Sequence, residues 1–532
     1  MHQLSGAEQQ PKASAGLLKS SMVVSTFTFL SRILGLIRDV VLARFLGADA
    51  NADAFIVAFK IPNFMRRLFA EGAFAQAFVP VLSEYREQGS HAAVRQLLNA
   101  VAGCLGSTLI LLTVLVVAGA PLVTMLFAPG FYMEGGERYA LASDMIRITF
   151  PYLLLISLTG FAGAILNSYD RFAVPAFTPV LLNICLIAAA IYLSPYFERP
   201  VMALAWGVLA AGVVQLLFQL PFLYQLRLLP YPAPNWKDSG VRRILALMAP
   251  AIFGVSVSQI NLLLDTVLAS LLPLGSVTWL YFSDRLAELP LGVFGIAVAT
   301  VILPSLSRQH SADKPEQFSA TMDWALRLVL LIAVPAALAL ILLAEPILTT
   351  LFQYGKYSAE DILMASWSLR AYAFGLVAFM LIKILAPGYF SRQDTKTPVK
   401  YGIIAMVSNM ALNIAFVWPL YTYMNLGHVG LALATSCSAF INAGLLLSGL
   451  RRDRVYRAEP GWWAFALRML VANVAMAAVL LYLNAQWQDW YQWGWWQRTY
   501  TMLALVLAGL CSYALVLVLA GVRPKHLKQK KY

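Results

Sequence analysis

The chain has 532 residues, of which 60% are hydrophobic and only 12% are charged. This composition excludes a soluble or disordered protein and is typical of a membrane protein with many spanning helices. The formal net charge is +13, but the basic residues gather in predicted loops. Membrane topology therefore explains most of the net charge. Contact with anionic lipid headgroups explains the basic tail, and no nucleic-acid partner is expected.

About fourteen spanning helices are predicted, because one span needs roughly 20 residues. Residues 1–16 are polar and lack the apolar stretch of a signal peptide, so they are expected to form a cytoplasmic tail. Apolar runs and helix breakers place the spans near 17–46, 52–84, 93–127, 140–167, 173–194, 201–227, 241–272, 276–307, 319–352, 360–390, 397–418, 429–450, 461–484 and 498–521.

Positive charge in the predicted loops sets the orientation. The loops on one side, together with both tails, hold most of the lysines and arginines outside the spans, including the basic tail 522–532. The other side carries only Arg138, Arg199, Lys356 and Arg498. Because cytoplasmic loops are the positive ones, both termini are predicted to be cytoplasmic.

An internal repeat relates two parts of the chain. Residues 39–46 resemble 265–272, 78–83 resemble 302–307, and Leu-Asn-Ile at 182–184 recurs at 412–414. An even number of spans separates the copies, so they share one membrane orientation. The repeat predicts two six-helix lobes, 17–227 and 241–450, with 461–521 as an addition. Two lobes around a central site are typical of an alternating-access transporter.

Four arginines lie inside predicted spans. They are Arg32, Arg38, Arg66 and Arg285. A charge at this depth is expensive and normally faces a polar cavity, and the arginine fork suits a phosphate group. These residues predict an anion site. The alternative for the second copy is an internal ion pair of Arg285 with Glu288, as for Arg67 with Glu71, since residues three or four apart share a helix face.

A second group of polar residues could hold a monovalent cation. Asn261 and Asp265 lie in one predicted span, Asn409 and Asn413 in another, and Thr435 in the next. An isolated carboxylate in a membrane needs a proton or a cation, and neutral oxygens would complete a cage. The alternative is ordinary hydrogen bonding between helices.

No motif for catalysis is present in the sequence. GxxxxGK[ST], HExxH and GxSxG patterns are missing, as are acidic metal-binding clusters. A nucleotide hydrolase or a metallohydrolase is therefore not expected, and neither is an enzyme that acts on polyprenyl phosphate.

Four segments resemble the MurJ (MviN) family of lipid II flippases. They are SRILGLIRD at 31–39, KIPNFMRRLFAEGAF at 60–74, FQYGK at 352–356 and LAPGYFSRQDTKTP at 385–398. The resemblance implies a fourteen-helix, MATE-like transporter of the bacterial inner membrane. The implied substrate is lipid II, the undecaprenyl-pyrophosphate-linked disaccharide-peptide precursor of peptidoglycan, and a monomer is expected.

The resemblance also implies roles for particular residues. The four arginines match the family's cavity arginines and would bind the pyrophosphate. Asp265 matches the acidic position of a family sodium site, with Asn409, Asn413 and Thr435 as partners. Residues 461–521 would form a groove for the lipid tail. Secondary cavity charges are expected at Asp39, Asp53, Lys60, Glu71 and Glu288.

Two related functions compete with this interpretation. One is an oligosaccharide-lipid flippase, and the other is a cation-coupled multidrug exporter of the same superfamily. An exporter of organic cations would favour carboxylates in its cavity, whereas these spans are rich in arginine.

Overall fold

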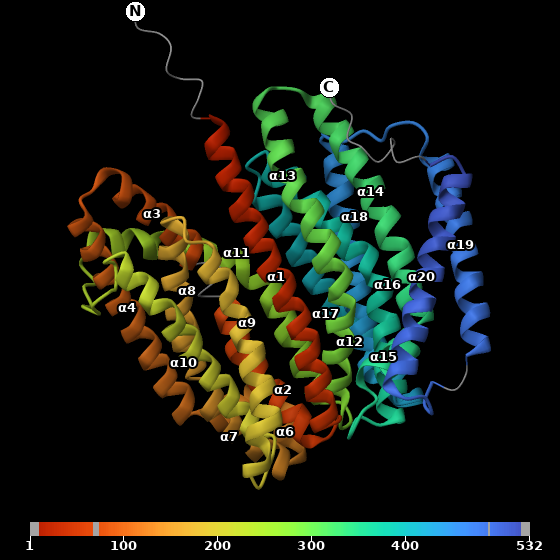
Figure 1. Ribbon diagram of the computed structural model, residues 1–532, viewed down its shortest axis with the longest axis horizontal. Helices are drawn as coiled ribbons and strands as arrows, with labels where there is room; N and C mark the ends of the chain where they lie inside the picture. Colours follow the sequence, from red (N-terminus) through yellow and green to blue (C-terminus); the bar gives the residue numbers. More distant parts are fainter. Residues whose placement is uncertain (1–9, 68–73, 488–489, 523–532) are drawn as a thin grey trace, which may run out of the picture. The chain divides into compact units, whose positions relative to one another are not determined.

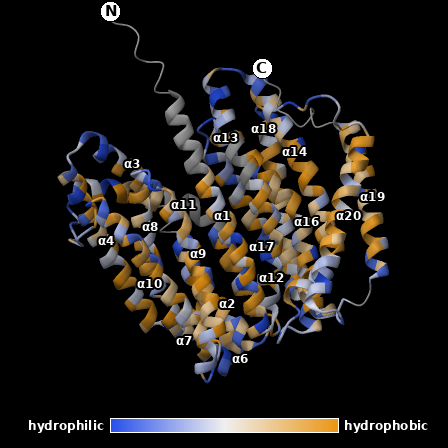
Figure 2. Cartoon of the chain, viewed as in Figure 1, coloured by the Kyte–Doolittle hydropathy of each residue, from blue (hydrophilic) through white to orange (hydrophobic). Residues whose placement is uncertain are grey.

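Every described element is a helix. The computed structural model describes residues 10–67, 74–487 and 490–522, and no strand occurs among them (Figure 1). Ten of the described helical segments are long and apolar enough to cross a membrane, and Figure 2 shows their apolar residues along α4, α10, α19 and α20. The predicted class, an all-helical polytopic membrane protein, is confirmed.

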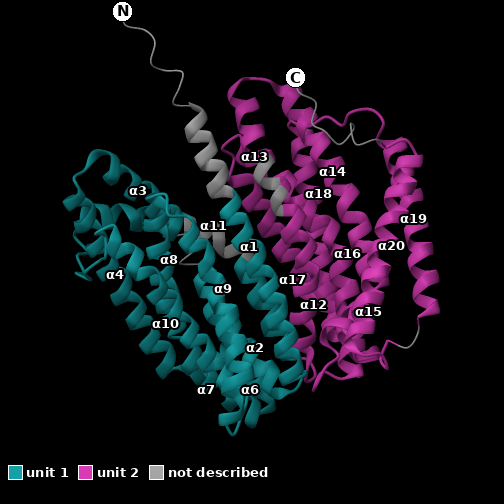
Figure 3. Cartoon of the chain, viewed as in Figure 1, with its two compact units in different colours: residues 1–271 teal, residues 272–532 magenta. Residues whose placement is uncertain are grey.

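The chain forms two compact units, 1–271 and 272–532 (Figure 3). The helices of the first unit are α1 (Gln10–Leu46), α2 (Ala50–Met65), α3 (Phe74–Gln88), α4 (His91–Ala118), α5 (Ala120–Phe127), α6 (Pro129–Glu134), α7 (Glu137–Thr149), α8 (Tyr152–Ser168), α9 (Ala173–Ala188), the π-helix η2 (Ala189–Leu193), the 3-10 helix η3 (Ser194–Tyr196), α10 (Met202–Gln225) and α11 (Ser239–Ser270).

The helices of the second unit follow the same order as the predicted spans. They are α12 (Ser276–Pro290), the π-helix η4 (Leu291–Gly295), α13 (Ile296–Ser311), α14 (Pro315–Leu342), α15 (Ala344–Phe352), α16 (Ala359–Phe390), α17 (Lys396–Met424), α18 (Gly427–Arg452), α19 (Trp462–Gln486) and α20 (Trp495–Leu519).

Several predicted spans are divided in the structure. The span 93–127 consists of α4 and α5, and the span 276–307 consists of α12, η4 and α13. The span 52–84 contains α2 and α3, and its residues 68–73 lie outside the described residues. The π-helical turn of η4 follows Pro290, where proline cannot donate the usual backbone hydrogen bond. In a search of the described residues alone, the ten apolar membrane-crossing helices correspond to every predicted span except 17–46, 52–84, 241–272 and 276–307. These are the repeat-equivalent spans, which contain all four predicted anion-binding arginines and Asp265.

The boundary between the two packed units, after residue 271, lies one helix later than the boundary between the predicted lobes. Although α11 begins the predicted lobe 241–450, it packs against α2, α3, α4, α5 and α6 of the first unit. Its last turn meets α6 so closely that a side chain at Gly130 would collide with the backbone of Ser270. The predicted lobes rest on the internal repeat in the sequence, whereas the two observed units rest on packing. The lobes therefore stay a prediction.

The second unit is built around α16. This helix packs against α12, α13, α14, α15 and α18, and its buried face includes Leu376, Met380 and Leu385. Within a membrane, lipid is as apolar as these side chains, so close packing and hydrogen bonds hold the helices together. One such bond runs from the buried Ser436 Oγ on α18 to the carbonyl oxygen of Ala371, at 2.7 Å.

Two polar clusters attach α19 and α20 to the second unit. At the start of α19, the buried carboxylate of Asp323 on α14 accepts from Trp462 Nε1 at 2.8 Å and from Tyr456 Oη at 2.8 Å. Arg327 Nε lies 2.8 Å from the same carboxylate. At the start of α20, Arg498 is 4% exposed and donates to the carbonyl oxygens of Trp490, Tyr491, Thr349 and Gln353.

We predict that Arg498→Met destabilises the protein more than Arg468→Met, which removes an exposed arginine of α19. The substitution at Arg498 leaves buried carbonyl groups without donors, and the expected loss is about 2 to 3 kcal/mol of unfolding free energy. Thermal unfolding of the purified proteins in one detergent measures the difference. Equal melting temperatures for the two variants would show that the Arg498 cluster contributes no stability.

Candidate functional site

Arg38 is buried in α1 and is held by two side chains. Its Nε and Nη2 atoms donate to Asp39 Oδ1 at 3.0 and 2.7 Å, and Nη1 donates to Asn183 Oδ1 at 3.0 Å. Arg38 is 5% exposed and Asp39 is 3% exposed. The predicted cavity charge Asp39 therefore balances the predicted ligand-binding Arg38.

Asn183 is the residue that sequence reasoning missed here. It lies on α9, which packs along α1, and its Nδ2 atom donates to the carbonyl oxygen of Ser31 at 3.0 Å. The amide thus bridges the backbone of α1 and the guanidinium of Arg38. Its signal was already present in the sequence, because Asn183 is the centre of the repeated Leu-Asn-Ile segment.

The remaining predicted cations of the first unit are half-buried. Arg32 lies on α1, one helical turn and a half before Arg38. Arg66 follows α2, and its Nε atom donates to Asn63 Oδ1 at 3.4 Å. Lys60 donates from Nζ to Thr266 Oγ1 on α11, also at 3.4 Å.

Asp53 forms an ion pair with Arg138, which was not expected from the sequence. The sequence placed Arg138 in an extracytoplasmic loop, but it lies in α7 and is 6% exposed. Its Nη1 atom is 3.4 Å from Asp53 Oδ2, and Nη2 is 3.0 Å from Glu134 Oε2. Nη2 also reaches the carbonyl oxygen of Ser270 at the end of α11, at 3.5 Å. This cluster joins α2, α6, α7 and α11.

Arg285 lies on α12 in the second unit and is partly exposed. Its Nη1 atom is 3.6 Å from Glu288 Oε2, and the two side chains are 34% and 46% exposed. The guanidinium also lies over the ring of Tyr281, 5.3 Å from its centroid. The ion pair that the spacing allowed is therefore present. A partly exposed ion pair of this length contributes little to stability. The corresponding Glu71 lies outside the described residues.

The predicted cation ligands of the second unit form a hydrogen-bonded cluster. Asn409 Nδ2 lies 3.3 Å from Thr435 Oγ1 and 3.3 Å from Ser438 Oγ, and Asn413 Nδ2 donates to Asn409 Oδ1 at 2.7 Å. Bonding between α17 and α18, the alternative reading, is thus observed. Asp265 is half-buried on α11 of the first unit. Among described residues, no group of three or more His, Cys, Asp and Glu could hold a metal.

The fold and these charges define a polytopic helical membrane protein of the transporter class. Its helices carry cationic groups that contact carboxylates, amides, hydroxyls and aromatic rings.

Comparison with known proteins narrows this class. The family model described as lipid II flippase MurJ matches residues 42–501. A probable lipid II flippase MurJ of Vibrio cholerae is 51% identical, with 97% of this chain and 98% of the relative covered. A lipid II flippase MurJ of Burkholderia cenocepacia is 43% identical, with 88% and 91% covered. This chain belongs to the MurJ family of lipid II flippases.

Solved structures agree with this membership. A lipid II flippase MurJ in an inward closed conformation has a TM-score of 0.78 at 27% identity, covering 93% of this chain and 98% of that one. A multidrug resistance MATE family transporter of the MOP superfamily, inward-facing, has a TM-score of 0.64 at 16% identity, covering 82% and 98%. The second likeness shows the fold alone. The protein is a multi-pass protein of the inner membrane.

We predict that Arg38→Met destabilises the protein strongly, because it leaves the carboxylate of Asp39 buried beside an apolar side chain. Breaking one partner out of a buried ion pair costs about 3 to 5 kcal/mol. Adding Asp39→Asn to Arg38→Met should recover part of this loss, on the order of 1 kcal/mol. Arg44→Met, which changes an exposed arginine of the same helix, is the matched control. Equally unstable single and double variants at 38 and 39 would rule out coupling between these side chains.

Proposed function

We propose that this protein moves lipid II from the inner to the outer leaflet of the cytoplasmic membrane. The observation that carries the proposal is membership of the lipid II flippase family over residues 42–501, together with arginines on spanning helices in both units. Lipid II is an undecaprenyl pyrophosphate linked to a disaccharide-peptide. Its headgroup is too polar to cross a bilayer unaided, so it requires a polar path lined by cations.

The arginines are proposed to bind the pyrophosphate. Arg285 is partly exposed, and its planar fork can form two parallel bonds to phosphate oxygens. Replacing its long contact with Glu288 by such bonds would strengthen the interaction. Arg32, Arg66 and Lys60 are half-buried and supply further positive charge. Arg38, which Asp39 and Asn183 orient, is proposed to contribute through Nη1 when the ligand competes for it.

The lipid tail is proposed to follow α19 and α20. Most of their surface is exposed and apolar, as at Leu467, Leu470, Leu481, Leu503 and Leu510. The clusters at Asp323 and Arg498 attach both helices to the second unit at their starts, and Met476, Leu480 and Leu505 pack in the core between them. The two helices are thus attached at their starts and have an apolar outer surface, along which a polyprenyl chain can pack.

Transport by alternating access requires no bond to be made or broken, so we propose that the protein is a transporter without enzymatic activity. We further propose that it works as a monomer, with both termini in the cytoplasm and no nucleic-acid partner. Two of the four basic residues predicted on the outer side, Arg138 and Arg498, are buried and engaged in structural contacts. This finding leaves even less free positive charge on that side and supports the proposed orientation.

A sodium ion is proposed to bind at Asp265, with Asn409, Asn413 and Thr435 as oxygen donors. The internal repeat supports this proposal. Asp39 corresponds to Asp265 and Asn183 corresponds to Asn413, but Arg38 corresponds to Leu264. In the first copy a guanidinium balances the carboxylate and contacts the asparagine oxygen. A monovalent cation is proposed to take the equivalent place in the second copy, where the arginine is missing.

We predict that Arg285→Ala abolishes lipid II transport and leaves a folded protein in the membrane. The side chain is partly exposed, so its removal leaves no buried charge without a partner. Arg285→Lys should restore part of the activity, since lysine keeps the charge but lacks the fork. Growth of cells that rely on each variant measures transport, and membrane content measures folding.

Glu288→Gln is the matched control for Arg285. It removes the ion pair and keeps the guanidinium, so growth should be retained. Normal growth with Arg285→Ala would exclude the proposed role, whereas loss of growth with both variants would show that the ion pair is the essential feature.

We predict that sodium chloride raises the melting temperature of the purified protein above the value in choline chloride at equal concentration. A ligand that binds only the folded state stabilises it by mass action. Asp265→Ala should remove the difference, whereas Asp361→Asn, in a loop-proximal capping box of α16, should keep it. An identical response of the wild-type protein to both salts would disprove the sodium site.

A further inference from the structure

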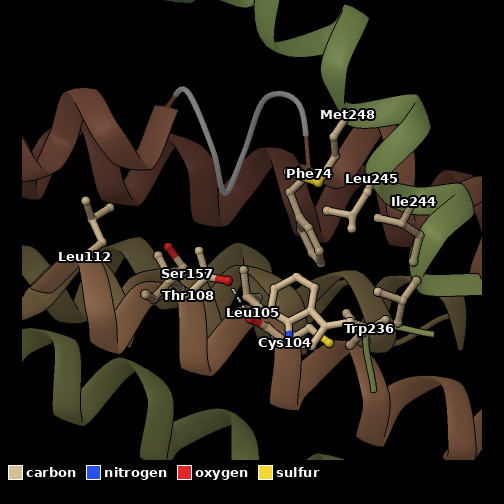
Figure 4. Close-up of a pocket in the computed structure, with 13 residues that line it drawn as sticks. Phe74, Cys104, Leu105, Thr108, Leu112, Ser157, Trp236, Ile244, Leu245 and Met248 are labelled. Carbon is tan, nitrogen blue, oxygen red and sulfur yellow. Dashed lines mark hydrogen bonds between the residues drawn. The ribbon is translucent and has the colours of Figure 1, made fainter. Parts of the chain in front are cut away.

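The first unit contains an apolar cavity away from all of the residues discussed above. Its volume is about 190 Å³, and it lies between α3, α4, α8, α11 and the segment before α11 (Figure 4). Phe74 closes it from α3, Leu105 and Leu109 line it from α4, and Ile244 and Met248 line it from α11. None of the predicted anion or cation ligands borders this cavity.

One end of the cavity reaches the protein surface. Trp236 and Leu245 line that end and are 49% and 44% exposed. The segment that carries Trp236 is fixed on α4, because Ala233 N donates to the carbonyl oxygen of Asn99 at 3.1 Å. A side chain at Gly103 would collide with the backbone of Pro234. The entrance is therefore a built part of the fold.

The opposite end holds a hydroxyl group with no hydrogen-bond partner. Ser157 on α8 is 2% exposed, and within the described part of the chain its Oγ atom makes no hydrogen bond. Other hydroxyls of these helices bond back to their own backbone. Thr108 donates to the Cys104 carbonyl oxygen at 2.8 Å, and Thr159 donates to that of Leu155 at 2.8 Å. In Figure 4, Ser157 and Thr108 lie at the end near Leu112, away from Trp236.

Water does not satisfy Ser157 well. A buried water needs two to four polar partners, and apolar cavities stay dry, as does one of about 150 Å³ that binds benzene. This cavity is larger and supplies a single unpartnered hydroxyl. A hydrocarbon chain would fill the space but leave the hydroxyl unmet, which is unfavourable for a buried polar group.

We propose that the cavity is a binding site for a small apolar molecule with one hydrogen-bonding group, of the alkylphenol class. The ring and alkyl group occupy the space between Phe74, Leu105 and Ile244, and the hydroxyl bonds to Ser157 Oγ. Such a ligand contacts α4, α8 and α11 at once and stabilises their packing. The predicted anion and cation ligands do not line this site, and its ligand enters past Trp236 and Leu245.

The test uses the full-length protein in nanodiscs of phosphatidylethanolamine and phosphatidylglycerol, with a diazirine-bearing phenol as the photoprobe. Labelling should concentrate on peptides of α4, α8 and α11 and should saturate. Unlabelled 4-butylphenol should compete about fivefold better than butylbenzene, the difference expected from one neutral hydrogen bond. Ser157→Ala should abolish this preference and leave the competition by butylbenzene unchanged.

Two further variants separate the cavity from the general lipid-facing surface. Leu105→Trp fills the cavity and should suppress saturable labelling, whereas Leu111→Trp, at a 61% exposed position of the same helix, should not. Since Ser157→Ala removes only one oxygen, it decides the test even if Leu105→Trp does not fold. Unsaturable labelling spread over lipid-facing helices, or equal competition by phenol and benzene derivatives in the wild type, overturns the proposal. A diazirine-bearing acyl chain that labels the site without displacement by 4-butylphenol would assign the cavity to lipid instead.

Discussion

The need to neutralise buried charge determines which helices of this protein are held together. A guanidinium buried in a membrane protein is costly unless acceptors converge on it. Three buried arginines of this protein join elements that are distant in sequence. Arg38 joins α1 to α9 through Asn183. Arg138 joins α7 to α2 through Asp53, and Arg498 joins α20 to the end of α15. The hydrophobic effect is weak between helices in lipid and would not position these helices alone. The contacts of the three arginines fix their positions.

The same constraint separates structural from functional arginines. Arg138 and Arg498 are buried, and their Nη atoms contact protein acceptors, so a ligand would have to displace internal contacts to reach them. Arg285 differs, because its side chain is partly exposed and its contact with Glu288 is long. Arg38 stands between these cases, with a strong pair to Asp39 and one further bond to a neutral amide. A flippase must bind its anionic substrate and then release it. Arginines with weak contacts to the protein suit that task better than buried arginines that are held by several protein acceptors.

Much of the fold was predictable, because length and apolarity decide where a chain crosses a membrane. The span 360–390, for example, corresponds to α16 at Ala359–Phe390. The interruption of the span 276–307 by a π-helical turn at η4 was not predicted, because one proline in an apolar run also fits a continuous helix. Arg138 was misplaced because a charge near a span's end resembles a loop residue. Its partner Asp53 is distant in sequence, and no local pattern reveals such a pair. Asn183 was visible as a repeated residue, but its contact with Arg38 required the packing of α1 on α9.

The central claim is that this chain carries lipid II across the membrane by means of its arginines. The most direct measurement is the leaflet distribution of lipid II in cells depleted of the protein and supplied with Arg285→Ala or Glu288→Gln. The account predicts that lipid II is trapped on the cytoplasmic leaflet without the protein and with Arg285→Ala, and that it reaches the outer leaflet with Glu288→Gln. Normal appearance of lipid II on the outer leaflet in depleted cells, with no other flippase present, would contradict the account.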